Sequence, residues 1–476
     1  MRKDPTLTGV NRIWRFLTGV AIVSIAMLIG CNPKSDGPAW QSYVKLDTSN
    51  LPVDPNRQLI VWLKPGTTDV DFKKWLDSVH DSRGNVQISK ICSGCDDSLF
   101  MITGPGAELY IMGQTAGGGS QCTGSRCGPS GDDGPVLYSI NFDMQSNDYN
   151  DDSLHYRDTS GTVYSRPPIA VGIFDTGVDP VAFGTNYYSS SDNACFNPGS
   201  SIANNGWNFV AQNNNWMDDY PSKHGTNVTG FIIGQAEKAK FNPVRILPVK
   251  IHDKDGHAGL FSVLCAFSYA ANRGVRIINA SFGYYAPLPK LTTSDPDSCA
   301  LLLKAFVKKY TTEKQILLIA AAGNSGNIYE DTASAFRGLN KRSLDDVAFY
   351  PASFARDSAF NNVLAVTTID TATQTVSPHQ NFSQHVVDVG VQTDEILAGE
   401  RYIFIKLGLP SGFVSTVEGS SFATPIVTGI IASYYSQIES LRGNKTLIIR
   451  KLLSIGKAKS FPLLSTKINN GIVMVK

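Results

Sequence analysis

Ile169-Ala-Val-Gly-Ile-Phe-Asp-Thr-Gly177 is a short apolar run that ends in Asp175, and four similar runs follow it along the chain. Segments long enough for helices separate these runs. They are RILPVKI (245–251), VRIINASF (275–282), ILLIAAAGN (316–324) and VLAVTTID (363–370). Continuous apolar strands that alternate with helices are typical of a parallel sheet buried on both faces. The sequence therefore predicts an α/β fold, a doubly wound parallel sheet with helices on both faces.

Polar residues interrupt the apolar pattern where the strands end. Asp175 follows the first run at once, and Asn324 closes the run at 316–324. In doubly wound folds the chemistry sits beyond the carboxyl ends of the strands. An Asp after a strand is more often a turn or helix cap, so Asp175 alone is weak evidence for a site.

Two further segments place reactive side chains at predicted helix starts. His224 lies in KHGTNVTG (223–230), ahead of an apolar helix. Ser421 lies in GSSFATP (419–425), ahead of a second one, where a Ser also fits as a helix N-cap. The helix N-terminus and the backbone N–H of Ser421 would stabilise an oxyanion formed near its hydroxyl. The side-chain amide of Asn324 is a second candidate donor to that oxyanion.

The four segments together resemble the subtilisin-like serine proteases, the subtilase family. The motifs DTG, HGTNVTG, AAGN and GSSFATP occur in the family's order of Asp, His and Ser. The stretch HDKDGHAGLFSVLCAFSYAANRGVRIINASFG (252–283) also resembles the family, as do FYPASF, QNF and NNGIV. The resemblance covers roughly residues 168 to 474. It implies a subtilisin-like fold and serine endopeptidase activity.

Position by position, the resemblance assigns a role to each candidate residue. Asp175 would orient and stabilise the imidazolium, His224 would take and return the proton, and Ser421 would attack the scissile carbonyl. Asn324 and the Ser421 amide would form the oxyanion hole.

An extended polypeptide would bind as an added strand, because backbone pairing is how sheet edges hold peptides. The segments assigned to substrate binding are Ser281, Phe282 and Gly283, then His257, Ala258 and Gly259, and finally Ala321, Ala322 and Gly323. The chemistry requires no cofactor, and structural calcium sites stay open. The sequence departs from the family pattern at Asn227, where a second His is usual, and at Thr229, where Ala is usual. We expect both to adjust the packing without loss of activity.

The N-terminus predicts export. Basic residues precede an apolar run at 16–29 that is too short to span a bilayer stably. The run ends in Leu-Ile-Gly-Cys31, which resembles the lipobox of bacterial lipoproteins. We therefore predict a signal peptide at 1–30, lipidation of Cys31 and a polar tether at 31–50. The protein would then be lipid-anchored in the bacterial cell envelope, in the periplasm or at the cell surface. The alternative is a signal peptide cleaved elsewhere.

Residues 51–145 predict a small α+β domain. Strands are expected at 58–63, 86–91, 98–103 and 136–142, with a short helix near 107–114. A helix is expected in DVDFKKWLDSVH (69–80), where Phe72, Trp75, Leu76 and Val79 share one face. This order resembles the family's inhibitory propeptide, and a permanent accessory domain is the alternative. The Asp- and Asn-rich stretch 143–152 predicts an exposed linker, which is assigned to 146–165, ahead of the peptidase domain at 166–476.

The chain has 8 cysteines. In an exported protein, Cys92, Cys95, Cys122 and Cys127 are predicted to form disulfides, in any of three pairings. A four-thiolate zinc site and a thioredoxin-like redox site are weaker alternatives. Cys265 lies in an apolar helical stretch and is predicted to be a buried free thiol.

The charge is balanced, with 42 Lys and Arg against 41 Asp and Glu, so nothing points to a nucleic-acid partner. Polypeptide substrates are the expected partners, together with the membrane through the lipid and the chain's own N-terminal domain as inhibitor. Two other functions stay open: a catalytically silent binding lipoprotein on the same scaffold, and a dedicated maturation protease for one partner. A sedolisin-type acid peptidase is disfavoured, because its base is Glu.

Overall fold

The computed structural model describes residues 58–83, 85–92, 95–107, 131–141, 143–145, 166–189, 205–286, 300–324, 342–370, 373–392, 395–397, 400–405, 415–417, 419–455 and 462–473. The predicted signal peptide, Cys31, the tether and the linker at 146–165 lie outside these residues. Their assignments stay predictions, as do the domain boundaries.

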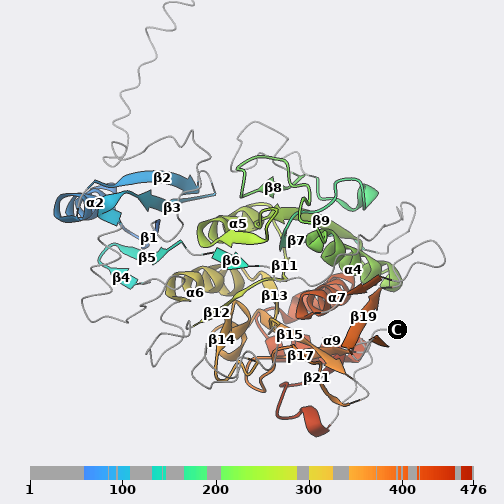
Figure 1. Cartoon of the computed structure of the whole chain (residues 1–476). Helices are drawn as coiled ribbons and strands as arrows, with labels where there is room; N and C mark the ends of the chain where they lie inside the picture. Colours follow the sequence, from blue (N-terminus) through green and yellow to red (C-terminus); the bar gives the residue numbers. More distant parts are fainter. Residues whose placement is uncertain are drawn as a thin grey trace, which may run out of the picture.

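A parallel sheet forms the centre of the larger unit (Figure 1). Its order is β21-β17-β15-β13-β11-β7-β9-β8, with every neighbouring pair parallel, and β16 adds to β15 antiparallel. The strands are β7 (Ile169–Asp175), β8 (Trp207–Asn208), β9 (Val244–Lys250), β11 (Ile277–Ala280), β13 (Leu317–Ala321), β15 (Val363–Asp370), β16 (Thr375–Val376), β17 (Val389–Gln392) and β21 (Gly471–Val473). All five apolar runs of the sequence form strands of this sheet, as predicted.

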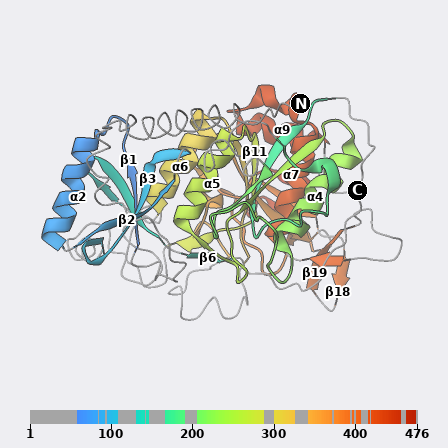
Figure 2. The ribbon, with the colours of Figure 1, turned by 90° about the horizontal axis from the view of Figure 1, so that it is seen from above.

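Helices cover both faces of the sheet. One face carries α4 (His224–Ala239), α7 (Ser420–Ser433) and α9 (Lys445–Ile455), and the other carries α5 (Leu260–Asn272) and α6 (Leu301–Lys308) (Figure 2). Side chains of one strand alternate between the two cores: Leu317 and Ile319 of β13 lie in the core on the α4 side, and Leu318 and Ala320 in the core on the α5 side. Alternation across a strand explains why these runs are apolar throughout. The predicted α/β fold class is confirmed.

The described part of the N-terminal unit contains a five-stranded antiparallel sheet, on which the helix α2 (Asp69–Arg83) packs. Its order is β2-β3-β1-β5-β4. The strands are β1 (Leu59–Leu63), β2 (Gln87–Cys92), β3 (Asp96–Thr103), β4 (Gly131–Asp133) and β5 (Val136–Ile140). The four apolar residues predicted for one face of the helix are all buried in this unit's own core: Phe72, Trp75, Leu76 and Val79.

The two faces of this small sheet meet different partners. Leu59 and Val61 of β1 point into the core under α2, whereas Ile60 and Trp62 join the core that α5 and α6 share with the large sheet. The Trp62 ring lies 4.6 Å from the Phe306 ring of α6, measured between centroids. Seen from above, α5 and α6 lie between the two sheets (Figure 2). The N-terminal unit is therefore docked on the larger unit through a buried apolar face.

A short strand continues from the N-terminal unit onto the larger one. β6 (Asp143–Gln145) pairs antiparallel with β10 (His257–Gly259), with Met144 opposite Ala258. Met144 is fully buried. The exposed linker predicted at 143–152 is thus wrong for its first residues, because an apolar side chain and a free edge strand outweigh the polar composition around them.

The remaining described elements of the larger unit are short. The strands are β12 (Tyr284–Ala286), paired with β14 (Ala348–Tyr350), and β18 (Glu395–Leu397), β19 (Glu400–Ile405) and β20 (Ser415–Val417), which form a small antiparallel sheet. The short helices are η3 (Gly184–Asn186), η6 (Lys309–Glu313), η7 (Ala352–Arg356), α8 (Tyr435–Ile438), η8 (Glu439–Leu441) and η9 (Pro462–Leu464).

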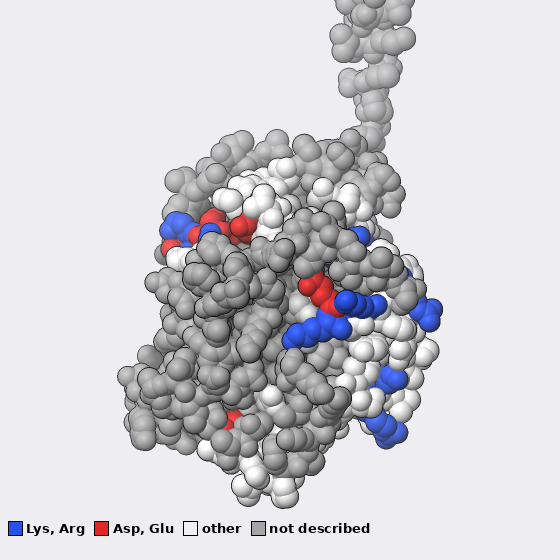
Figure 3. Space-filling view, turned by 90° about the vertical axis from the view of Figure 1, so that its right-hand side faces the viewer, with Lys and Arg blue, Asp and Glu red and all other residues white. Residues whose placement is uncertain are grey.

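The face of the molecule shown in Figure 3 carries side chains of both charges. On the face shown in Figure 3, Lys and Arg side chains lie interspersed with Asp and Glu side chains. Within the described ranges, no helix combines the length and the apolar character needed to cross a bilayer.

Candidate active site

Three neighbouring strands deliver polar residues to one edge of the sheet. Asp175 is the last residue of β7, Ser281 follows β11, and Asn324 lies just beyond β13. These strands are adjacent and parallel, in the order β7-β11-β13. Their carboxyl ends therefore meet, as the motif positions predicted.

Asp175 and His224 form a buried pair at this edge. Nδ1 of His224 lies 2.6 Å from Oδ1 of Asp175, and the side chains are 1% and 2% exposed, respectively. The backbone N–H of Thr176 donates to the same carboxylate oxygen at 2.8 Å. Gly225 allows this approach, because a Cβ there would collide with the carbonyl of Gly177. The pair fixes the imidazole with Nε2 on the side of the ring away from the carboxylate.

Ser421 lies in the first turn of α7, next to this pair. Its hydroxyl donates to the carbonyl of Ser281 at 3.3 Å, so the proton does not point at His224 in this structure. The ring of its neighbour Phe422 lies 5.1 Å from the His224 ring, measured between centroids. The three candidate residues therefore share one site, with the Ser421 hydroxyl turned toward the β11 end.

Pro425 helps to position Ser421. A proline has no N–H, so the carbonyl of Ser421, four residues earlier, receives no helix hydrogen bond from it. That carbonyl instead accepts a 2.7 Å hydrogen bond from the hydroxyl of Ser281. Nδ2 of Asn279 in turn donates to the Ser281 hydroxyl at 2.9 Å. The first turn of α7 is thus tied to the end of β11.

Asn324 is held by its oxygen. Oδ1 accepts hydrogen bonds from the N–H and from the hydroxyl of Ser420, each at 3.0 Å. The Ser420 hydroxyl also accepts from the backbone N–H of Gly323 at 3.0 Å. With Oδ1 engaged, the NH₂ group of Asn324 is left to donate elsewhere, as an oxyanion donor must.

Two supporting residues were not singled out from the sequence. The amide oxygen of Gln380 accepts a second hydrogen bond from the Ser420 N–H at 2.7 Å. Nδ2 of Asn381 donates to the carbonyl of Ala322 at 2.8 Å and so braces the segment ahead of Asn324. Both lie in the QNF stretch, which was the only available signal for them.

The two departures from the family pattern are accommodated. Nδ2 of Asn227 donates to the carbonyl of Ser222 at 3.0 Å, and the hydroxyl of Thr229 donates to the carbonyl of Gly225 at 2.8 Å. Both residues are buried in α4. Neither leaves its polar group without a partner, in line with the packing adjustment that we expected.

Asp218 joins the loops on either side of the Asp175–His224 pair. Its carboxylate accepts a hydrogen bond from the Thr176 hydroxyl at 2.9 Å, and others from the N–H and hydroxyl of Thr226 at 2.9 and 2.8 Å. Burial raises the pKa of this carboxyl, against the effect of the Thr226 hydrogen bonds. No motif of the sequence indicates this residue.

The segments predicted to bind substrate take different positions. His257, Ala258 and Gly259 form β10 and are paired with β6 of the N-terminal unit. Ser281, Phe282 and Gly283 are buried beside the candidate residues, as are Ala321, Ala322 and Gly323. Gly323 has φ +93°, and a Cβ there would lie 2.7 Å from Asn381 Nδ2. Residues 281–283 and 321–323 thus lie at the site as predicted. Residues 257–259 are paired with β6 in this structure.

His252 is a second histidine beside the site that sequence reasoning missed. Its backbone N–H donates to the Asp175 carbonyl at 3.3 Å, and its ring lies edge-on to Phe282 at 5.7 Å between centroids. The ring is 1% exposed, and neither nitrogen has a hydrogen-bond partner within the described part of the chain. Burial lowers the pKa of His252 from 6.5 to about 4, and the charge of Asp175 opposes that shift.

His252 should therefore make folding stability depend on pH. A histidine with a lowered native pKa contributes stability above pH 6.5 that is lost as the pH falls toward 4. Across this window we expect His252→Leu to remove about 2–3 kcal/mol of the wild-type decline in the free energy of unfolding. Urea unfolding at pH 7, 5 and 4, in a Ser421→Ala background, measures it. His257→Asn, at an exposed histidine, is the control. If the free energy of unfolding of the His252 variant fell with pH as much as that of the parent chain, His252 would not be the group responsible.

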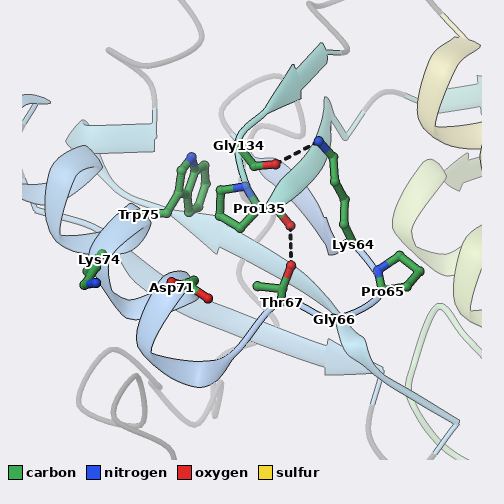
Figure 4. Close-up of a pocket in the computed structure, with 9 residues that line it drawn as sticks. All are labelled: Lys64, Pro65, Gly66, Thr67, Asp71, Lys74, Trp75, Gly134 and Pro135. Carbon is green, nitrogen blue, oxygen red and sulfur yellow. Dashed lines mark hydrogen bonds between the residues drawn. The ribbon is translucent and has the colours of Figure 1, made fainter.

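A surface depression on the N-terminal unit lies apart from this site. Lys64, Thr67 and Trp75 help to line it, and its walls are joined by hydrogen bonds from Lys64 Nζ to the Gly134 carbonyl (2.7 Å) and from the Thr67 hydroxyl to the Pro135 carbonyl (2.9 Å) (Figure 4). None of the candidate residues lies there. Among the described residues, no group of three His, Cys, Asp or Glu side chains is arranged to hold a metal ion.

Comparison with known proteins places the larger unit. The profile of the subtilase family matches residues 167–460. A thermophilic serine proteinase of a Bacillus species is 27% identical over 242 residues, 49% of this chain and 47% of that protein. A thermostable alkaline protease of Halalkalibacterium halodurans is 26% identical over 288 residues, 58% of this chain and 61% of that protein. The chain thus spans less than two thirds of the length of either relative.

A solved structure extends the similarity of fold to the N-terminal unit. It is a mutant of the epidermin leader peptide processing serine protease of Staphylococcus aureus. It matches with a TM-score of 0.52 and 19% sequence identity, over 87% of this chain and 97% of that chain. At this identity the similarity concerns the fold alone.

Proposed function

This chain belongs to the subtilase family, and from this premise we propose that it is a serine endopeptidase that hydrolyses peptide bonds of extended polypeptides. Asp175, His224 and Ser421 are the residues that we assign to the reaction. The observation that carries the proposal is the buried 2.6 Å contact between Asp175 Oδ1 and His224 Nδ1. It would hold the imidazole in the tautomer whose Nε2 can accept a proton.

The proposed reaction begins with a turn of the Ser421 hydroxyl. The proton now donated to the Ser281 carbonyl would pass to Nε2 of His224 as Oγ attacks the substrate carbonyl. Catalytic hydrogen bonds are often long or misaligned before substrate binds. His224 would then protonate the leaving amine, and water would hydrolyse the acyl-enzyme by the same route. The proposed reaction involves side chains, backbone amides and water.

A covalent probe tests the assignment of the nucleophile. An alkyl fluorophosphonate forms a stable ester with an activated serine, and mass spectrometry of the digested protein locates it. We expect the label on Ser421. Ser420 is the internal control, because its hydroxyl is engaged with Asn324 and Gly323. A label on any other serine would reject the assignment.

Asn324→Ala should leave a folded enzyme that is about 10²–10³ times slower in kcat, a loss near 3 kcal/mol of transition-state stabilisation. Asn324 would donate from Nδ2 to the oxyanion, while Ser420 holds its other end. Steady-state kinetics on a peptide substrate measures the effect. Gln384→Ala is the matched control, since this amide is exposed outside the site. An unchanged kcat would mean that Asn324 only caps the end of the strand.

We propose that the N-terminal unit inhibits the peptidase until it is removed. The pairing of β6 with β10 supports this, because an added strand there would occupy the backbone groups that we assign to substrate. The buried face between the sheet of this unit and α5 and α6 is a second support. The inhibitor would thus bind as a substrate does, joined to a docked domain.

We propose that the protein is exported and anchored in the bacterial cell envelope by lipid on Cys31. Cys31→Ser should then move the protein from the membrane fraction to the soluble fraction, because the lipid would be its membrane anchor. Fractionation in high salt, with detection of the intact chain, measures this shift. Ser35→Ala in the same tether is the matched control. Retention of the Cys31 variant in the membrane would argue against the anchor.

A further inference from the structure

Two cysteines from different units meet in the docking interface. Cys92 is the last residue of β2 in the N-terminal unit, and Cys265 lies in α5 of the larger unit. Both are free thiols, and they are only 0% and 2% exposed. Both side chains lie in the core that the two units share, where burial raises the pKa of the Cys265 thiol and Cys92 is close enough to help raise it. The disulfide predicted for Cys92 is wrong for this structure, the buried free thiol predicted for Cys265 is confirmed, and the sequence did not bring the two together.

Contacts between the two units fix the relative position of Cys92 and Cys265. Nζ of Lys309 forms an ion pair of 2.9 Å with Asp96, four residues after Cys92. The same ammonium lies 5.0 Å from the centre of the Trp62 ring, which packs on Phe306. Both sulfur atoms are carried by docked elements of one buried core, and a disulfide would join them by a bond of about 2.05 Å.

A neighbouring cysteine is already part of a disulfide. Cys95 is disulfide-bonded, three residues beyond Cys92. Disulfides persist in exported proteins and are rare where thiols are kept reduced. Conditions that oxidise Cys95 also supply the kind of oxidant that Cys92 would need.

We propose that Cys92 and Cys265 are oxidised to a disulfide that joins the N-terminal unit covalently to the peptidase unit. The oxidant is a small or protein disulfide. The Cys92 thiolate attacks it and releases one thiol of the oxidant. Cys265 then attacks the mixed disulfide and releases the second thiol. Two protein thiols are oxidised, one disulfide is reduced to two thiols, and the two protons end on those thiols.

Burial determines when this reaction takes place. It raises the pKa of the Cys265 thiol, and a protonated, covered thiol is a poor nucleophile. The first exchange therefore occurs on Cys92 before the units have docked or when their interface opens. Cys265 attacks the mixed disulfide as the units come together, before the closing interface covers its thiol. Once formed, the bond is covered by the same apolar interface.

The bond changes what cleavage of the linker achieves. Taken with the proposed inhibition, on which only this consequence rests, the cut N-terminal unit stays attached and β6 remains on β10. Release then requires reduction of the disulfide as well as proteolysis. The peptidase is thus gated by two independent events.

The test separates the bond from the catalytic activity. A full-length Ser421→Ala chain carries a site for an added specific protease inserted within 146–165, and it is oxidised with glutathione disulfide before cleavage. On a non-reducing denaturing gel we expect one band of joined fragments, which dithiothreitol converts into two. The same chain with Cys265→Ser should give two bands without reductant, as should the chain with Cys92→Ser.

Each outcome decides the proposal. Separate fragments from the oxidised parent chain, or joined fragments from the Cys265→Ser chain, overturn it. Should the Ser variants fail to fold, non-reducing peptide mapping of the parent decides, and the absence of a Cys92–Cys265 cross-linked peptide overturns the proposal. Peptidase activity is not a readout, so a failure of the proposed function leaves this result unaffected.

Discussion

Ser421→Ala is expected to give a folded chain whose kcat is about 10⁶-fold below that of the wild type. The substitution removes the only atom that we assign to the attack, while the Asp175–His224 pair and Asn324 remain in place. The remaining rate would come from the oxyanion donors and from substrate binding alone. Hydrolysis of a fluorogenic peptide measures the loss, and circular dichroism checks the fold.

Ser433→Ala is the matched control for this prediction. Ser433 is buried at the other end of α7, where its hydroxyl donates to the carbonyl of Ile430 at 2.8 Å. We expect this variant to keep kcat within a small factor of wild type. Substantial activity in the Ser421 variant would remove Ser421 from the mechanism.

The Ser421 variant should also stay in one piece. Along β6 the chain runs from opposite Gly259 to opposite His257. The His257 carbonyl accepts from the N–H of Asp253, and the N–H of the adjacent His252 donates to the Asp175 carbonyl, so β6 runs toward the side of the site that carries Asp175. Proximity of that kind makes attack effectively unimolecular. We expect the wild type to be cut between about 142 and 165 and the variant to be uncut, as read by N-terminal sequencing. An active wild-type enzyme without a cut would make the N-terminal unit a permanent domain.

Asp175→Asn should lower kcat by about 10⁴-fold with little change in structure. The amide is similar in size, but its NH₂ group cannot accept the Nδ1–H of His224, and its oxygen carries no charge to stabilise an imidazolium. The 2.6 Å contact is buried, so water does not replace the lost charge. Kinetics between pH 6 and 9 measure the loss.

Asp255→Asn is the control for charge removal near the site. Asp255 is exposed and pairs with its neighbour Lys254 on the surface. We expect its kcat to stay within about twofold of wild type, because exposed pairs contribute little. If Asp175→Asn behaved like this control, the Asp175–His224 contact would be structural.

The pattern of each apolar run was sufficient to predict the large sheet and the place of its site. A strand buried on both faces is apolar at every position, and this property is local, so RILPVKI and ILLIAAAGN predicted β9 and β13 on their own. Parallel strands end at one edge, which put Asp175 and Asn324 together before any contact was known. The helix starts at His224 and Ser421 followed from the same local patterns.

The tertiary structure alone decided what covers each face. The alternation of Leu59, Ile60, Val61 and Trp62 indicates two buried faces, but periodicity does not say that one meets α2 and the other α5 and α6. Other features also depend on residues far apart in the chain. They are the pairing of β6 with β10, the burial of Met144, the proximity of Cys92 to Cys265, and the burial of the His252 imidazole without a hydrogen-bond partner among the described residues. Such contacts depend on how finished elements dock, which requires matching surfaces that no single segment of sequence contains.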